Sequence, residues 1–139
     1  MVPKADSVKG YTWVLNPNRA LDVSEYNVGM MEKLSGKLVS RLKEQMPKDK
    51  RKQKYNYPVD AFGKWHQKRY YIIVKYACSG KNAISPFFEV NLARLNCVGN
   101  DRFNLFARRY NDEWILILKD GTLPRCFKEI ETNDWFHIW

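Results

Sequence analysis

The sequence predicts an α+β domain in which one long N-terminal amphipathic helix precedes an antiparallel meander sheet and a short C-terminal helix. Two observations carry this prediction. Apolar residues recur every four positions between residues 23 and 46, which is typical of an amphipathic helix. From residue 55 the spacing changes to two, and short polar turns separate the alternating segments, as expected for about five strands.

The long helix has an apolar stripe and a signal at each end. Asp22 or Ser24 is expected to cap its N-terminus. Pro47 ends it, because the residue before a proline disfavours the helical region. Gly29 and Gly36 each lower the helix propensity by roughly 1 kcal/mol relative to alanine, and we expect another backbone to come close there. The predicted stripe consists of Tyr26, Met30, Leu34, Leu38 and Leu42, and it is widened by Met31, Val39 and Met46.

The sheet is predicted over residues 55–118, with RYYIIVKYAC at 69–78 as its strongest strand. Tyr70, Ile72 and Val74 fall on one face of this strand, and the residues between them fall on the other. Pro58 places the first strand at an edge of the sheet, since proline cannot donate a ladder hydrogen bond. Gly63 is expected to break or bulge that strand. The remaining strands are predicted at 87–98, 102–110 and 114–118.

The whole chain, residues 1–139, is predicted to form a single domain. Residues 1–22 are an arm in which YTWVL is either a short strand or an apolar segment laid on the core. Residues 48–54 are a basic loop. Residues 122–139 are the C-terminal helix, which starts near Thr122 with Pro124 in its first turn, and an apolar tail.

Composition indicates a cytoplasmic protein. The chain is 45% hydrophobic, enough to bury a core, yet no segment has the length of a membrane span or the apolar run of a signal peptide. We therefore expect no membrane partner. The three cysteines, Cys78, Cys97 and Cys126, lack the close spacing of a zinc site and are expected to be reduced, partly buried thiols.

Positive charge is concentrated in one fifth of the chain. The net charge is +9, and residues 48–75 alone carry nine cations against Asp49 and Asp60. Charge that served only solubility would be spread more evenly, so this asymmetry favours a polyanionic partner.

The candidate site is therefore a nucleic-acid interface, for DNA or RNA, without catalysis. Clustered cations bind phosphates through counterion release, and bases can stack on an aromatic side chain in the same row. Arg69, Tyr71, Ile73 and Lys75 would form such a row on one face of the second strand. Of Arg108 and Arg109, only one can join it, because neighbouring residues in a strand point to opposite faces. The predicted interface comprises Lys48, Lys50, Arg51, Lys52, Lys54, Lys64, Trp65, Lys68, Arg69, Tyr71, Lys75 and Arg108.

Two other interpretations stay open. In one, Tyr71 and Ile73 pack under the long helix and the basic loop is only solvated. In the other, the chain is a protein-interaction module, such as an inhibitor or assembly subunit, whose cationic face meets an acidic protein. A nucleic-acid binder should gather cations and exposed aromatic rings on one continuous face, whereas an interaction module should show an apolar patch with a charged rim.

An enzyme is the least favoured interpretation, and no cofactor is expected. Asp60 and Glu89 with Lys64 or Lys75 are similar to the carboxylates and lysine of a metal-dependent nuclease. However, no lysine stands two residues after Glu89, where the usual arrangement has one.

A nucleophilic pair of Cys126 and His137 is the other catalytic candidate. His137 lies in the apolar tail WFHIW, where a histidine more often serves packing than chemistry.

Part of the chain resembles a known group of proteins. The segments YNY, VD, GKW, NAISP, FE, ARL and VGNDRFNL follow one another between Tyr55 and Trp135. This pattern resembles a family of small uncharacterised bacterial proteins, and GNDRFNL is its most specific part. The resemblance implies a compact domain and a bacterial or mobile-element setting, and it assigns no activity or site residue.

Overall fold

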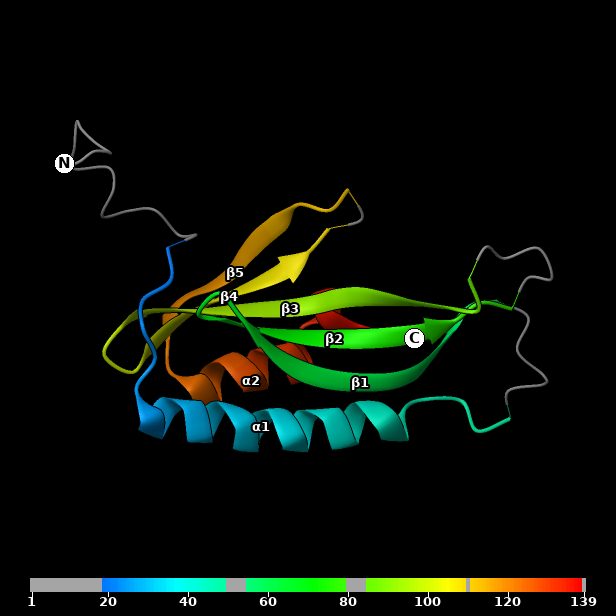
Figure 1. The fold of residues 1–139 in the computed structure, drawn as a ribbon, viewed down its shortest axis with the longest axis horizontal. Helices are drawn as coiled ribbons and strands as arrows, with labels where there is room; N and C mark the ends of the chain where they lie inside the picture. Colours follow the sequence, from blue (N-terminus) through cyan, green and yellow to red (C-terminus); the bar gives the residue numbers. More distant parts are fainter. Residues whose placement is uncertain (1–18, 50–54, 80–84, 110, 139) are drawn as a thin grey trace.

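The computed structural model describes residues 19–49, 55–79, 85–109 and 111–138. It confirms the predicted α+β class, with a helix, a five-stranded antiparallel sheet and a second short helix (Figure 1). The elements in chain order are α1 (Glu25–Glu44), β1 (Tyr57–His66), β2 (Arg69–Ala77), β3 (Phe87–Gly99), β4 (Arg102–Arg108), β5 (Trp114–Gly121), α2 (Leu123–Thr132) and the 3-10 turn η3 (Asp134–Phe136).

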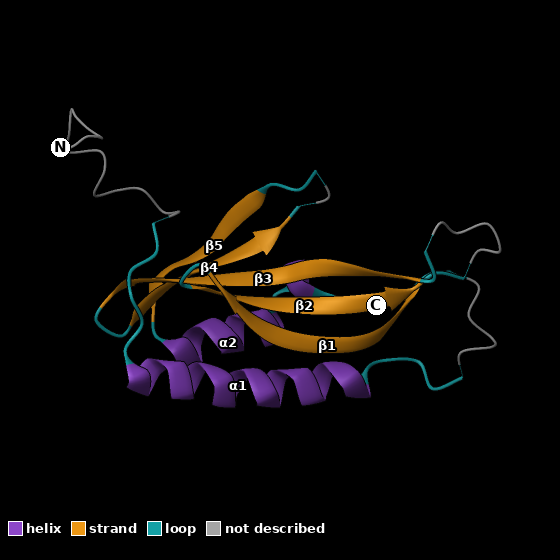
Figure 2. Ribbon diagram, viewed as in Figure 1, coloured by secondary structure: helices purple, strands orange, loops and turns teal. Residues whose placement is uncertain are grey.

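The strands form one meander in the order β1-β2-β3-β4-β5, so β1 and β5 are the edges. The edge position of β1 is the one that Pro58 predicted. Both helices lie on the same side of the sheet (Figure 2). We call this side the helix face and the opposite side the outer face. In the described part of the chain, no helix covers the outer face and no helix is long and apolar enough to cross a membrane.

Ser24 starts α1, because its hydroxyl accepts the backbone N–H of Asn27 at 3.2 Å. The helix ends at Glu44, close to the predicted Met46. Its buried side contains Met31, Leu38 and Leu42 of the predicted stripe, whereas Tyr26 is 69% exposed. Nothing lies within 4 Å of an added Cβ at Gly29 or Gly36, so the expected close backbone approach is wrong. The buried residues are Asn27, Met31, Ser35, Leu38 and Leu42.

Two polar residues on the buried side of α1 fix the helix to the sheet. The Asn27 amide donates to Asp101 Oδ1 at 2.8 Å, in the turn between β3 and β4. Ser35 Oγ accepts the hydroxyl of Tyr70 at 2.7 Å. Gly63 makes room for that bond, since a Cβ there would overlap the Tyr70 hydroxyl. The role of Gly63 is thus close packing, and β1 continues through it to His66 instead of breaking.

The core lies between the helix face and the two helices. Alternate residues of β2, β3 and β4 supply its apolar side chains from the sheet, and α2 supplies Cys126, Phe127 and Ile130. The apolar tail closes one end, as expected, with Phe136 and Ile138 buried. The Tyr76 hydroxyl donates to the Ile138 carbonyl at 2.9 Å and so ties the tail to β2. The sheet residues in the core include Ala61, Tyr70, Ile72, Val74, Ala93, Leu95, Phe103 and Leu105.

A bulge in β3 changes which residues share a face. Ile72 lies opposite Ala93 and Ile73 lies opposite Asn91, so Leu92 is an extra residue in β3. Asn91 therefore points to the outer face together with Arg94, although the two are an odd number of residues apart. The β1–β2 turn is a two-residue hairpin loop in which Gln67 and Lys68 both have positive φ, at 49° and 68°, as a type I′ turn requires.

β3 is longer than β4, and only its second part pairs with that strand. Its pairing with β4 begins at Ala93 and runs to Gly99, while its pairing with β2 begins at Phe87. Figure 1 shows β4 and β5 turning away from β3 beyond this point. The first part of β3 therefore has β2 on one side and no described strand on the other.

Candidate nucleic-acid interface

The outer face collects most of the predicted cationic residues in the sheet. The strand register places Lys64 opposite Tyr71, and Tyr71 opposite Arg94. Arg108, and not Arg109, points to the same face, where it lies opposite Trp114. The cations of this face are Lys64, Arg69, Lys75, Arg94 and Arg108.

Few free carboxylates offset these cations. Asp112 pairs with Arg108 at 3.1 Å, and Asp60 pairs with Lys43 of α1 at 3.3 Å. Glu89, opposite Lys75, is exposed and makes no ion pair within the described residues. The outer face is therefore positively charged near Lys64 and Arg69, whereas Lys75 lies between the carboxylates of Asp60 and Glu89.

Aromatic rings and guanidinium groups stack on one another at the centre of this face. The Arg94 guanidinium lies 4.3 Å from the centroid of the Phe106 ring and 4.8 Å from that of Trp114. The Arg108 guanidinium lies 5.2 Å from the centroid of the Trp114 ring. Trp114 meets the Tyr71 ring edge-on at 6.0 Å. These contacts bring a residue of β5 within reach of β2, so the outer face is curled.

Arg94 is only 7% exposed although no helix covers it. Burial lowers the pKa of its guanidinium, and the hydrogen bond with Tyr71 opposes that shift. The stacked rings supply the favourable interaction that such a buried cation needs. The aromatic side chain Tyr71 is thus half-buried in a stack, and it does not stand free on the surface.

A shallow hollow of about 250 Å³ opens beside this stack. Its lining includes the amide of Asn91, which makes no hydrogen bond within the described residues. His66 and Tyr71 are neighbours in its wall, with ring centroids 6.3 Å apart. The hollow is lined by Lys64, His66, Tyr71, Ile73 and Asn91.

The interpretation in which Tyr71 and Ile73 pack under the long helix is wrong for both residues. They lie on the outer face, and it is Tyr70, Ile72 and Val74 that meet the helices. Ile73 is nevertheless only 7% exposed, because the curled face buries it.

Trp65 does not belong to the outer face. Its position opposite Tyr70 turns it to the helix face, where it is half-buried against the core. The two rings meet edge-on with centroids 4.9 Å apart. The exposed tryptophan expected at this position is therefore a packing residue.

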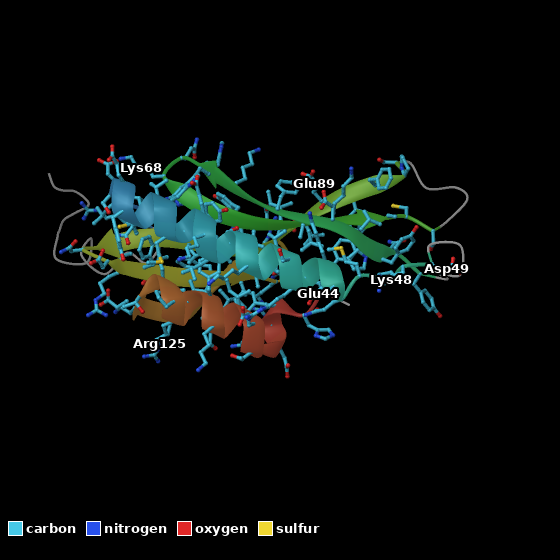
Figure 3. The ribbon with its side chains drawn as sticks, turned by 90° about the horizontal axis from the view of Figure 1, so that it is seen from below. Glu44, Lys48, Asp49, Lys68, Glu89 and Arg125 are labelled. Atoms are coloured by element: carbon cyan, nitrogen blue, oxygen red, sulfur yellow. The ribbon has the colours of Figure 1, made fainter. Side chains whose placement is uncertain are left out.

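The basic stretch does not form one compact patch. Lys48 and Lys68 lie at opposite ends of the molecule, separated by the length of β1 (Figure 3). Lys68, at the tip of the β1–β2 turn, pairs with Asp22 at 3.2 Å. Four predicted residues of the basic loop lie outside the described residues: Lys50, Arg51, Lys52 and Lys54.

Four residues of the face were missed by sequence reasoning: His66, Asn91, Arg94 and Trp114. The bulge at Leu92 hides Asn91 and Arg94, because simple alternation puts them on opposite faces. Trp114 could be assigned only after the curl of the sheet was known. His66 had a signal, since it stands two residues after Lys64 in the same strand.

The structure bears on both catalytic alternatives. The register places Lys75 between Asp60 and Glu89, so the carboxylates and lysine of the nuclease alternative lie on neighbouring strands. The described residues hold no group of three or more His, Cys, Asp or Glu that could bind a metal. Burial raises the pKa of the Cys126 thiol to about 12, so this residue is not a ready nucleophile.

Comparison with known proteins gives one match. A family model with the description "Domain of unknown function (DUF3024)" matches residues 31–139, which contain all of the sheet and α2. No curated protein and no solved structure matches the chain.

Proposed function

The chain belongs to the DUF3024 family, and we propose that the outer face of its sheet binds nucleic acid, preferably single-stranded, without catalysis. Such a protein would serve as an accessory or regulatory subunit of a bacterial or phage nucleic-acid system. Free thiols at all three cysteines support a reducing, cytoplasmic setting.

One observation carries the proposal. Five cations and the half-buried rings of Tyr71 and Trp114 share a face that no described helix covers. From Arg69 to Lys75 this row extends roughly 20 Å, at about 3.3 Å per residue of strand. A backbone of several phosphates can follow such a row, and the release of its counterions provides the binding free energy.

The hollow beside the row adds a place for a base. His66 and Tyr71 offer ring edges and faces, Asn91 offers an amide donor and acceptor, and Lys64 stands at the rim. Single-stranded bases are recognised by such combinations of stacking and hydrogen bonds to their edges. A paired duplex keeps its bases stacked inside, so we expect single strands to bind more tightly.

The test is fluorescence anisotropy with labelled single- and double-stranded DNA and RNA, at about 50 and about 200 mM salt. The variant Lys64→Gln/Lys75→Gln removes two charges from the outer face. Its matched control is Arg125→Gln/Lys128→Gln, which removes two exposed charges from α2 on the other side of the sheet.

We expect the outer-face variant to bind about tenfold more weakly at low salt, with the salt slope reduced by about two, and the α2 control to stay close to wild type. Equal losses in both variants would mean that only net charge matters. Absence of binding at low salt would overturn the proposal in favour of an acidic protein partner. A separate variant, Lys50→Gln/Arg51→Gln/Lys52→Gln, measures how much the basic loop contributes to nucleic-acid binding.

A further inference from the structure

The first part of β3 has a backbone edge on which no strand of the described residues lies. Pairing with β4 starts at Ala93, so Phe87 to Leu92 are paired only with β2. Figure 1 shows this part of β3 continuing alone beside β2 after β4 has turned away. Unpaired strand edges present rows of N–H and C=O groups that can pair with another chain.

One hydrogen bond shows which backbone N–H and C=O groups of β3 point away from β2. The Cys78 N–H donates to the Pro86 carbonyl at 2.9 Å, so the backbone of residue 86 faces β2. Backbone groups alternate along a strand, and Phe88 and Val90 therefore also face β2. Phe87, Glu89 and Asn91 face away from it. The Ser85 hydroxyl accepts the Phe87 N–H at 3.4 Å and donates to the Phe87 carbonyl at 2.8 Å. Within the described residues, the free backbone groups are therefore those of Glu89 and Asn91.

Apolar side chains flank this edge in the open. Phe87, Phe88 and Val90 are 45%, 39% and 37% exposed, which is high for consecutive large apolar residues of a strand. Phe88 stacks on Tyr76 at 5.4 Å, and Lys75 lies 4.5 Å over the Phe87 ring. Each ring is thus held in place on one side and open on the other.

A groove of about 420 Å³ runs along the same edge. One wall is β3, and the other walls are the diverging β4–β5 turn and the C-terminal segment. Within it the Arg108 charge is neutralised by Asp112, whereas the neighbouring Arg109 is exposed and has no ion pair in the described part of the chain. The lining residues include Glu89, Val90, Asn91, Arg109, Trp135 and His137.

We propose that this edge takes up an extended segment of a partner protein as an additional strand beside β3. The free backbone groups require a partner that supplies alternating donors and acceptors, which an extended chain does. Phe88 and Val90 favour apolar side chains at every second position of the segment. Arg109 and the net charge of +9 favour acidic residues between them.

A second copy of the chain fits this edge less well. In an antiparallel pair of two β3 edges centred on Glu89, the two glutamates would lie directly opposite each other, which is unfavourable. This edge adjoins the hollow of the outer face, since Asn91 lines both. The inference rests on the backbone groups of β3, so it does not depend on nucleic-acid binding.

The backbone can be tested at one position. Glu89→Pro removes an N–H that faces the free edge, and proline is tolerated at such positions. Val90→Pro removes an N–H that bonds β2 and should lower stability. Glu89→Lys keeps the N–H and is the matched control for the lost carboxylate. The probe is a fluorescein-labelled peptide in which valine alternates with glutamate, and its reference is the same peptide N-methylated at alternate residues.

We expect wild type and Glu89→Lys to bind the peptide, with Glu89→Pro folded but at least about tenfold weaker and the N-methylated peptide inactive. Amide hydrogen exchange gives a second readout. In the free protein Phe88 and Val90 should be protected and Glu89 and Asn91 should exchange fast, until the peptide protects them.

Two results would overturn the proposal. The first is fast exchange at the Glu89 and Asn91 amides in the presence of millimolar peptide. The second is their protection in the free protein, which would mean that the chain itself covers the edge or, if protection rises with protein concentration, that a second copy does.

Discussion

The two faces of the sheet are both buried at their centres, but by different means. On the helix face, Ile72, Val74 and Leu95 are covered by α1 and α2. On the outer face, Arg94, Asn96, Asn104 and Phe106 are at most 7% exposed although no described helix lies over them. Here the curl of the sheet and the long side chains of the face cover its own centre.

The difference lies in what each face requires of its residues. An apolar core depends mainly on volume and tolerates conservative exchange. Buried polar groups must each keep a particular partner, as Asn104 does by accepting the Asp120 N–H at 3.0 Å. The helix face is therefore suited to hold the fold, and the outer face to hold charged groups in fixed positions.

The largest effect is expected on the helix face at Gly63. Gly63→Ala places a Cβ onto the Tyr70 hydroxyl and 2.6 Å from Ser35 Oγ, so the bond between them must break. Overpacking and the lost bond together should lower the free energy of unfolding by about 3 kcal/mol, measured by urea denaturation.

Gly36→Ala is the matched control for Gly63→Ala. Its Cβ meets nothing within 4 Å, and alanine is the better helix former, so stability should rise by up to about 1 kcal/mol. Equal stability of Gly63→Ala and wild type would mean that Tyr70 and Ser35 do not fix the sheet to α1.

On the outer face, Arg94→Ala should lower the free energy of unfolding by about 2 kcal/mol, because the stacks with Phe106 and Trp114 are lost. The rings are uncharged, so we expect the loss to change little between low and high salt. Arg94→Lys keeps the charge without the planar group, so it should retain only part of the stability that Arg94→Ala loses. Denaturation of these two variants at two salt concentrations would check this, and a strongly salt-dependent loss would contradict the stacking account.

The smallest effect concerns Tyr70. Burial raises the pKa of its phenol, the Ser35 hydrogen bond opposes the shift, and the Glu32 charge adds to it. A folded-state pKa above the unfolded value gives stability that is present below about pH 10 and is lost as the pH rises further. Tyr70→Phe should cost about 1 kcal/mol at neutral pH.

The same variant should also lose stability less steeply than wild type above about pH 10, because it removes one of the buried phenols. Tyr76, whose pKa burial also raises, would account for part of the remaining slope. Thermal denaturation from pH 7 to 11 would show the difference, and parallel curves for the two proteins would remove Tyr70 from the alkaline transition.

The order and type of the elements could be predicted from the sequence, because period and turn residues are local signals. α2 was predicted with its observed start after Thr122. The buried side of α1 could be predicted only in part. Its apolar residues follow from the stripe, whereas Asn27 and Ser35 are polar and are buried because Asp101 and Tyr70 bond them. Such partners are distant in the chain.

The candidate site was predicted only in part, because the positions of some of its residues depend on contacts that are distant in the chain. The row from Arg69 to Lys75 follows from alternation within one strand. Arg94 points to the outer face with Asn91 because of the bulge at Leu92. Trp114 contacts Tyr71 because the whole sheet is curled. The distance between Lys48 and Lys68 depends on β1 running through Gly63, where a break was expected.

The carboxylate of Glu89 has a consequence for the behaviour of the protein in concentrated solution. It stands between Phe88 and Val90 on the free part of β3, where an uncharged residue would leave a continuous apolar edge. A charge at this place acts as a gatekeeper against edge-to-edge aggregation. The carboxylate thus opposes pairing between two such edges, while the backbone of the same residue faces the free edge.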